Sequence, residues 1–82
     1  MTRLIVERVD RIPSRPWLFV TGRLEGNAVH VGDVMTVSHG QAAQTSAVIR
    51  AIEFHSRPGK TTIAVDGDLA DSVQVGATLS RD

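Results

Sequence analysis

The sequence predicts a single all-β domain. Valine, isoleucine and threonine make up 23 of the 82 residues, and such branched side chains favour a pleated, half-buried surface over a helix. Short runs rich in them recur along the chain with Gly, Asp, Asn, Ser or Pro between them, which is typical of sandwiches and small barrels. Because 82 residues are too few for two domains, we expect residues 1–82 to form one domain of six or seven strands.

The first third of the chain should contain two strands. The first is Leu4–Val9, followed by a loop in which Pro13 and Pro16 cannot donate ladder hydrogen bonds. The second is Trp17–Leu24. It leads into Glu25-Gly26-Asn27, where glycine and asparagine tolerate the positive φ of a tight hairpin, so a chain reversal is expected there.

The middle of the chain is less clear. Valines on either side of His30 alternate with it, and after Gly32-Asp33 a further strand is expected at Val34–Val37, followed by a loop at Ser38–Gln44. The segment Thr45–His55 fits both a helical spacing of its apolar residues and an alternating face. The pattern alone therefore leaves helix and strand open for this segment.

The last third should add two more strands. Arg57-Pro58-Gly59 predicts a turn, and Thr61–Val65 a strand. Asp66–Ser72 is polar and reads as a connection, and Val75–Leu79 then closes the domain.

The charge balance excludes a strong overall field. Nine basic and nine acidic residues give a net charge of zero, so any contact with nucleic acid or an anionic membrane must use a local patch. Residues 1–23 hold five arginines and two acids, whereas residues 61–82 hold four aspartates and Arg81. One pole of the domain is therefore expected to be basic. The preference for arginine over lysine fits base composition as well as phosphate contacts, and we favour the former.

The absence of cysteine excludes disulfides, thiol nucleophiles and thiolate metal sites, and favours a cytoplasmic protein. The first residues contain too short an apolar run for a signal peptide or a membrane span.

Three apparent motifs do not carry chemistry. Gly59-Lys60-Thr61 resembles the end of a phosphate-binding loop, but Phe54 stands where that loop needs its first glycine. Asp66–Asp71 resembles the start of a calcium loop, but Ala70 and Ala77 occupy ligand positions. The imidazoles lack the close spacing of a zinc site, so no metal or cofactor is expected. They are His30, His39 and His55.

No serine or carboxylate stands in a catalytic pattern, so we expect no enzymatic activity. Trp17 and Phe19 would share one strand face. We interpret them as core residues, with stacking on a nucleobase as the alternative.

Several short segments, in their order along the chain, resemble the second domain of elongation factor Tu and related translational GTPases. The most informative is Val-Thr-Gly-Arg-Leu-Glu-Gly at residues 20–26, followed by Val-His-Val-Gly-Asp at residues 29–33. The other matching segments are Val6–Pro13, Pro58-Gly59, Ile63–Gly67 and Val75–Ser80. Together they cover about residues 4 to 81.

The resemblance implies a small closed antiparallel barrel of six to seven strands in Greek-key order, and it implies that Thr45–His55 is strand. By the same comparison Gly22 lies where a strand bends, and Gly32 and Gly76 make tight turns. In that family the opening strand helps to hold the aminoacyl end of tRNA. Here Glu7 keeps the first acid, but Arg8 and Asp10 replace the following acid and the aromatic, and Thr61 stands near the place of an expected asparagine.

The resemblance therefore implies a non-catalytic binding domain of the translation machinery, acting without GTP hydrolysis. The first hypothesis is contact with RNA or the ribosome through arginines that neutralise phosphates. The candidates are Arg8, Arg11, Arg15, Arg23, Arg50 and Arg57. The alternative is a protein-interaction module that docks on a separately encoded GTPase or another partner. Neither hypothesis requires a membrane, a metal or a cofactor.

Overall fold

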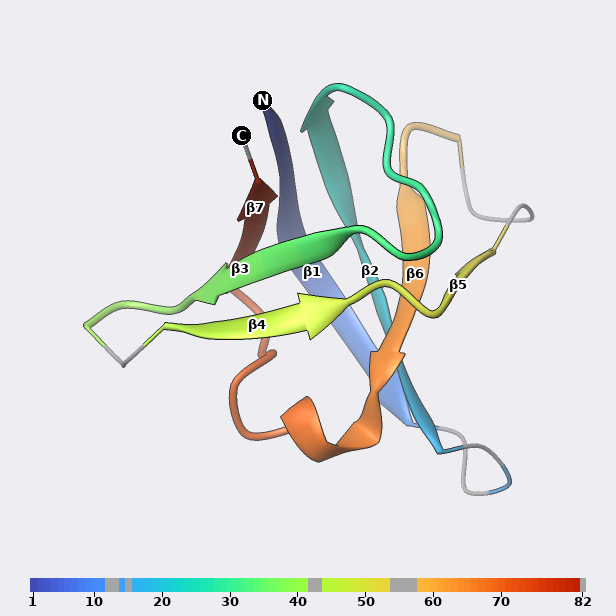
Figure 1. Ribbon diagram of the computed structural model, residues 1–82, viewed down its shortest axis with the longest axis vertical. Helices are drawn as coiled ribbons and strands as arrows, with labels where there is room; N and C mark the ends of the chain where they lie inside the picture. The colour runs from blue at the N-terminus through green and yellow to red at the C-terminus, as the bar shows by residue number, and fades with distance from the viewer. Residues whose placement is uncertain (12–13, 15, 42–43, 54–57, 82) are drawn as a thin grey trace.

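A computed structural model describes residues 1–11, 14, 16–41, 44–53 and 58–81 of the chain. These residues form one curled antiparallel sheet of seven strands, in the order β4-β3-β7-β1-β2-β6-β5 (Figure 1). The strands are β1 (Thr2–Arg11), β2 (Trp17–Gly26), β3 (Val34–Ser38), β4 (Thr45–Val48), β5 (Ala51–Glu53), β6 (Thr61–Asp66) and β7 (Thr78–Arg81). The predicted all-β class is confirmed.

The long ladder between β1 and β2 is the centre of the sheet. Its register shifts between Val6 and Arg8, so Glu7 is the extra residue of a β-bulge. Gly22 pairs with Val6 beside the bulge, and a Cβ atom there would lie 1.9 Å from the carbonyl oxygen of Ile5. The expectation of a glycine at a bend within a strand is confirmed, because only glycine permits this approach.

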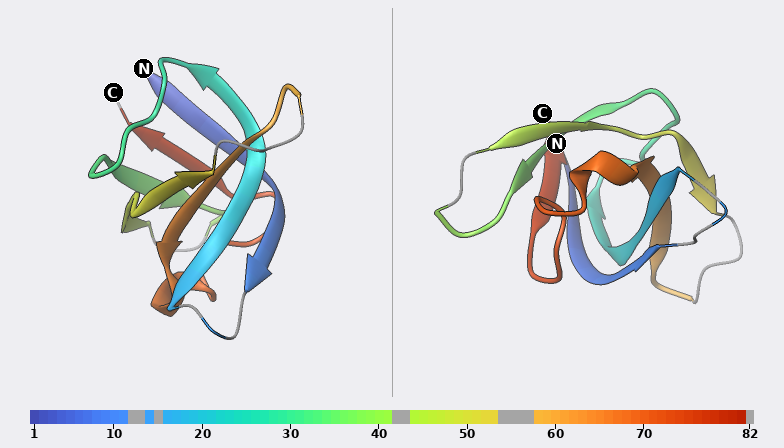
Figure 2. Two further views of the ribbon diagram at one scale, coloured as in Figure 1. Left: turned by 90° about the vertical axis from the view of Figure 1, so that its right-hand side faces the viewer. Right: turned by 90° about the horizontal axis from the view of Figure 1, so that it is seen from below.

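The ladder has a different third strand at each end. Near the chain terminus, residues Thr2–Ile5 of β1 also pair with β7. Beyond the bulge, residues Trp17–Gly22 of β2 pair with β6 instead. We call these the terminal end and the groove end of the ladder. The sheet as a whole is curled, as the two views of Figure 2 show.

The segment with the ambiguous pattern is extended. β4 pairs with β3, and β5 pairs with β6, with only Ile49 and Arg50 between the two strands. The backbone N–H of Ile49 donates to Asp33, and that of Arg50 donates to Ala64. Within the described residues 45–53 the strand prediction is confirmed, while His55 lies outside them.

The concave side of the sheet holds the apolar core. The core residues alternate along the strands with residues on the convex side, as half-buried strands require. They are Leu4, Val6, Leu18, Val20, Val29, Met35, Val37, Ala47, Ile49, Ile63, Val65, Val73, Ala77 and Leu79. The short helix η1 (Gly67–Leu69) lies at one end of this core (Figure 1).

Two predicted apolar runs are loops over part of their length. Val29 is buried, but Val31 is 63% exposed and neither belongs to a strand. The chain between η1 and β7 also turns before Thr78, so the last strand starts later than predicted. Gly32 and Gly76 have φ angles of 95° and 94°, which confirms the expected turns at both glycines. No helix within the described ranges is long and apolar enough to span a membrane.

Candidate functional site

Two rows of side chains run across four strands on the convex side at the groove end. The strand registers align one residue from each strand in each row. The first row is Asp10, Phe19, Ala64 and Ala51, and the second is Arg8, Thr21, Thr62 and Glu53. Trp17 pairs with Asp66 beside the first row. The rows bring residues distant in sequence onto one surface.

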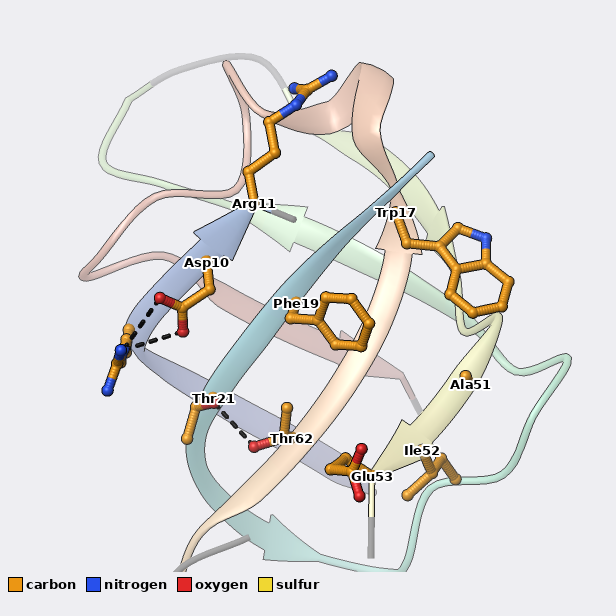
Figure 3. Close-up of a pocket in the computed structure, with 10 residues that line it drawn as sticks. Asp10, Arg11, Trp17, Phe19, Thr21, Ala51, Ile52, Glu53 and Thr62 are labelled. Atoms are coloured by element: carbon orange, nitrogen blue, oxygen red, sulfur yellow. Dashed lines mark hydrogen bonds and ion pairs between the residues drawn. The ribbon is translucent and has the colours of Figure 1, made fainter. Parts of the chain in front are cut away.

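A groove of about 690 Å³ follows these rows (Figure 3). Short side chains leave it hollow, because Ala51 lines it and the fully buried Ala64 separates Ala51 from Phe19 across the row. Trp17 and Phe19 pack edge to face, with ring centroids 6.5 Å apart and an interplanar angle of 69°. The lining residues are Arg8, Asp10, Arg11, Trp17, Phe19, Thr21, Ala51, Ile52, Glu53 and Thr62.

The expectation that Trp17 and Phe19 fill the core is wrong. Both are only partly buried, whereas Leu18 and Val20 between and beside them are at most 2% exposed. The strand prediction was right, but β2 has apolar residues on both of its faces, so its alternation did not identify the inner one. The groove could have been predicted from this second apolar face of β2.

The polar groups of the groove are largely paired with each other. The Arg8 guanidinium lies 2.9 Å from Oδ2 of Asp10 and donates to Oδ1 at 3.1 Å. The hydroxyls of Thr21 and Thr62 share a hydrogen bond of 2.8 Å. Arg11 donates from Nη1 to the carbonyl oxygen of Gly67 at 3.4 Å, and Figure 3 shows its side chain extending from the end of β1 away from Asp10.

The other candidate arginines lie outside the groove. Arg23 is at the terminal end, where it shares the Glu25 carboxylate with Arg3. The hydrogen bond from Arg3 and the positive charges of both arginines hold the pKa of Glu25 below its ordinary value. The position of Arg15 and that of Arg57 fall outside the described residues.

Arg50 lies in the link between β4 and β5 and forms two hydrogen bonds of 3.1 Å with the carboxylate of Asp66. These bonds and the opposite charges lower the pKa of Asp66 and raise that of Arg50. This bidentate pair joins the link to the end of β6 beside Trp17, so Arg50 supports one border of the groove.

The basic residues of the first third do not gather at one pole. Arg3 and Arg23 lie at the terminal end, and Arg8 and Arg11 lie at the groove end. Lys60 also pairs with Glu7 at the bulge. Across the described ranges no group of three or more histidine or acidic side chains could hold a metal ion.

Comparison of the sequence with family models and with curated proteins finds no match. The groove and its lining are therefore the observations from which a function can be argued.

Proposed function

We propose that this chain is a non-catalytic binding domain of the translation-factor barrel type that contacts single-stranded RNA through the groove on its convex side. The observation that carries the proposal is the placement of Trp17 and Phe19 on the outside of β2, beside Arg8 and Arg11. Aromatic faces next to arginines are the usual platform for unstacked bases and their phosphates.

The depth of the groove supports the same ligand. The short side chain of Ala51, which lines the groove together with Trp17 and Phe19, leaves space for a flat ring. Binding without catalysis is proposed because Asp10 is paired with Arg8, and the two threonine hydroxyls are paired with each other. None of these groups is placed as a free base or nucleophile.

The proposal includes a closed Greek-key barrel. The two strands at the ends of the sheet order, β4 and β5, are separated by two residues of one segment, and the N–H groups of that link bond to β6 and to the residue before β3. A segment that pairs with both edges would leave no open edge. Slow hydrogen exchange at the amides of Ile49 and Arg50 is expected if the barrel is closed.

Fluorescence of Trp17 tests the RNA contact. It is the single tryptophan of the chain, so its emission reports on the groove alone. Titration with a single-stranded RNA octamer at low salt should quench it, and the quenching should weaken steeply as salt rises. No quenching and no chemical-shift change at low salt would overturn the proposal.

A groove-filling variant provides the control. Ala51→Leu enlarges a side chain that lines the groove and fills part of its space, so RNA affinity should fall by about tenfold. Ala28→Leu makes the same change at an exposed residue of the loop after β2, and affinity should stay unchanged.

A second candidate is docking on a protein partner such as a separately encoded GTPase. It is favoured by the charge pairing, because Arg8, Arg23 and Arg50 each already face a carboxylate. It is also favoured by Val31 and Val34, which are 63% and 57% exposed. Titration with a translational GTPase should then shift the amides of these valines and leave Trp17 emission unchanged.

A further inference from the structure

The two arginines that line the groove differ in how much of their charge is available. Arg8 is held by Asp10 two residues further along β1, through contacts to both carboxylate oxygens. Arg11 has only one long hydrogen bond, to a neutral carbonyl group. Within the part of the chain that the structure describes, no carboxylate pairs with Arg11.

We propose that Arg11 makes a phosphate contact at the end of the groove, beside Gly67, and that Asp10 limits RNA affinity by pairing with Arg8. This inference rests on the proposed function, and it assigns separate roles to neighbouring residues of the site. An arginine already paired with a carboxylate gains little when a phosphate replaces that partner, whereas Arg11 has most of its five donors open.

Arg8 and Asp10 lie two positions apart on β1, so their side chains share one face of the strand. The bulge at Glu7 makes this face the convex one, where the two residues lie in adjacent rows of the groove. The contact is exposed, with 66% of the Arg8 side chain and 44% of the Asp10 side chain accessible. Such a pair is readily broken by substitution without loss of the fold.

The proposal predicts a gain of binding when an acid is removed. Asp10→Asn keeps the shape of the side chain but frees Arg8 for a second phosphate. The slope of log affinity against log salt should become steeper by about 0.7, which is the value for one phosphate contact on a single strand. If the variant and the wild type bind equally at 1 M salt, the steeper slope corresponds to roughly eightfold tighter binding of the variant at 0.05 M.

Arginine substitutions separate the two roles. Arg11→Gln should make the slope shallower by about 0.7, whereas Arg8→Gln should leave it unchanged in the wild-type background. Combining Arg8→Gln with Asp10→Asn should cancel the gain. Arg23→Gln, at the terminal end and outside the groove, is the matched control and should have no effect.

The experiment is Trp17 fluorescence titration of these full-length variants with the same RNA octamer over a range of salt concentrations. If the wild type is quenched but Asp10→Asn is no steeper, or if Arg8→Gln flattens the slope as much as Arg11→Gln, the assignment of Arg11 and Asp10 is wrong and the RNA contact stands. If the wild type is not quenched at all, the proposed function fails, and this inference fails with it.

Discussion

The terminal end and the groove end of the β1–β2 ladder carry the same number of arginines, but the side chains around these arginines differ. At the terminal end, Arg3 and Arg23 both face Glu25, and β1 also pairs with β7. At the groove end, Arg8 and Arg11 line the same groove as two aromatic rings and the short side chain of Ala51.

The difference between the ends teaches that arginine count is a poor guide to a binding site. At the terminal end both arginines share the Glu25 carboxylate, and the two aromatic residues that the structure describes lie at the other end. At the groove end the same residue type lines a groove that also holds two aromatic rings, which brings together the interactions that a base and its phosphate need. The bulge at Glu7 and the glycine opposite it divide the two ends.

The most damaging change should be at this boundary. Gly22→Ala would place a Cβ atom 1.9 Å from the backbone oxygen of Ile5, so the ladder itself must open. We expect a loss of about 5 kcal/mol, most of the stability of so small a domain. Urea unfolding followed by circular dichroism measures it.

Gly40→Ala is the matched control for this substitution. Gly40 has a φ of 59°, but a Cβ atom at this position would meet no neighbouring atom within 4 Å. The substitution therefore adds only conformational strain. A cost of about 1 kcal/mol is expected. If both variants lose equal stability, the close approach at the boundary is not what divides the two ends.

Neighbouring residues of β2 should separate folding from binding. Leu18→Ala removes a side chain that is 2% exposed, and about 3 kcal/mol of stability should be lost. Phe19→Ala, on the convex side, should cost about 1 kcal/mol of stability and about 1–3 kcal/mol of RNA binding. Urea midpoints and Trp17 titrations provide the two readouts. If Phe19→Ala lost more stability than Leu18→Ala, Phe19 would have to be a core residue.

Most of the strands could be predicted from the sequence and the site could not, for a physical reason. Branched residues and turn glycines act locally, so β2 and the turn at Gly32 could be predicted from them. The groove depends on register: Ala51, Ala64 and Phe19 come into one row only through pairing across three strands. The position of the Arg8–Asp10 pair on the convex side likewise depends on the bulge, which composition does not reveal.

The hydroxyl pair of the groove should contribute a smaller amount. Thr21→Val leaves the Thr62 hydroxyl without its 2.8 Å partner, and about 1 kcal/mol should be lost. The double variant with Thr62→Val keeps the shape of both side chains and removes both polar groups, so most of the loss should be recovered. A double-mutant cycle from urea unfolding measures the coupling. Additive losses would mean that the two hydroxyls do not support each other in the floor of the groove.

The acid dependence of stability should be the smallest effect, and it compares the two ends directly. Asp66 beside the groove and Glu25 at the terminal end both have a pKa lowered by arginine partners. A carboxylate whose pKa is lower in the folded chain stabilises the fold above its unfolded pKa, and this contribution disappears as pH falls through the folded value. Stability should therefore be flat near neutrality and fall below about pH 4.

Arg50→Gln should reduce the fall by returning Asp66 toward its ordinary pKa, and Arg3→Gln should do the same for Glu25. Because the two pairs lie at opposite ends of the ladder, their effects on the urea midpoint at pH 3 should add. If the combined variant changes the urea midpoint by less than the sum of the two single variants, the two ends are coupled through the bulge.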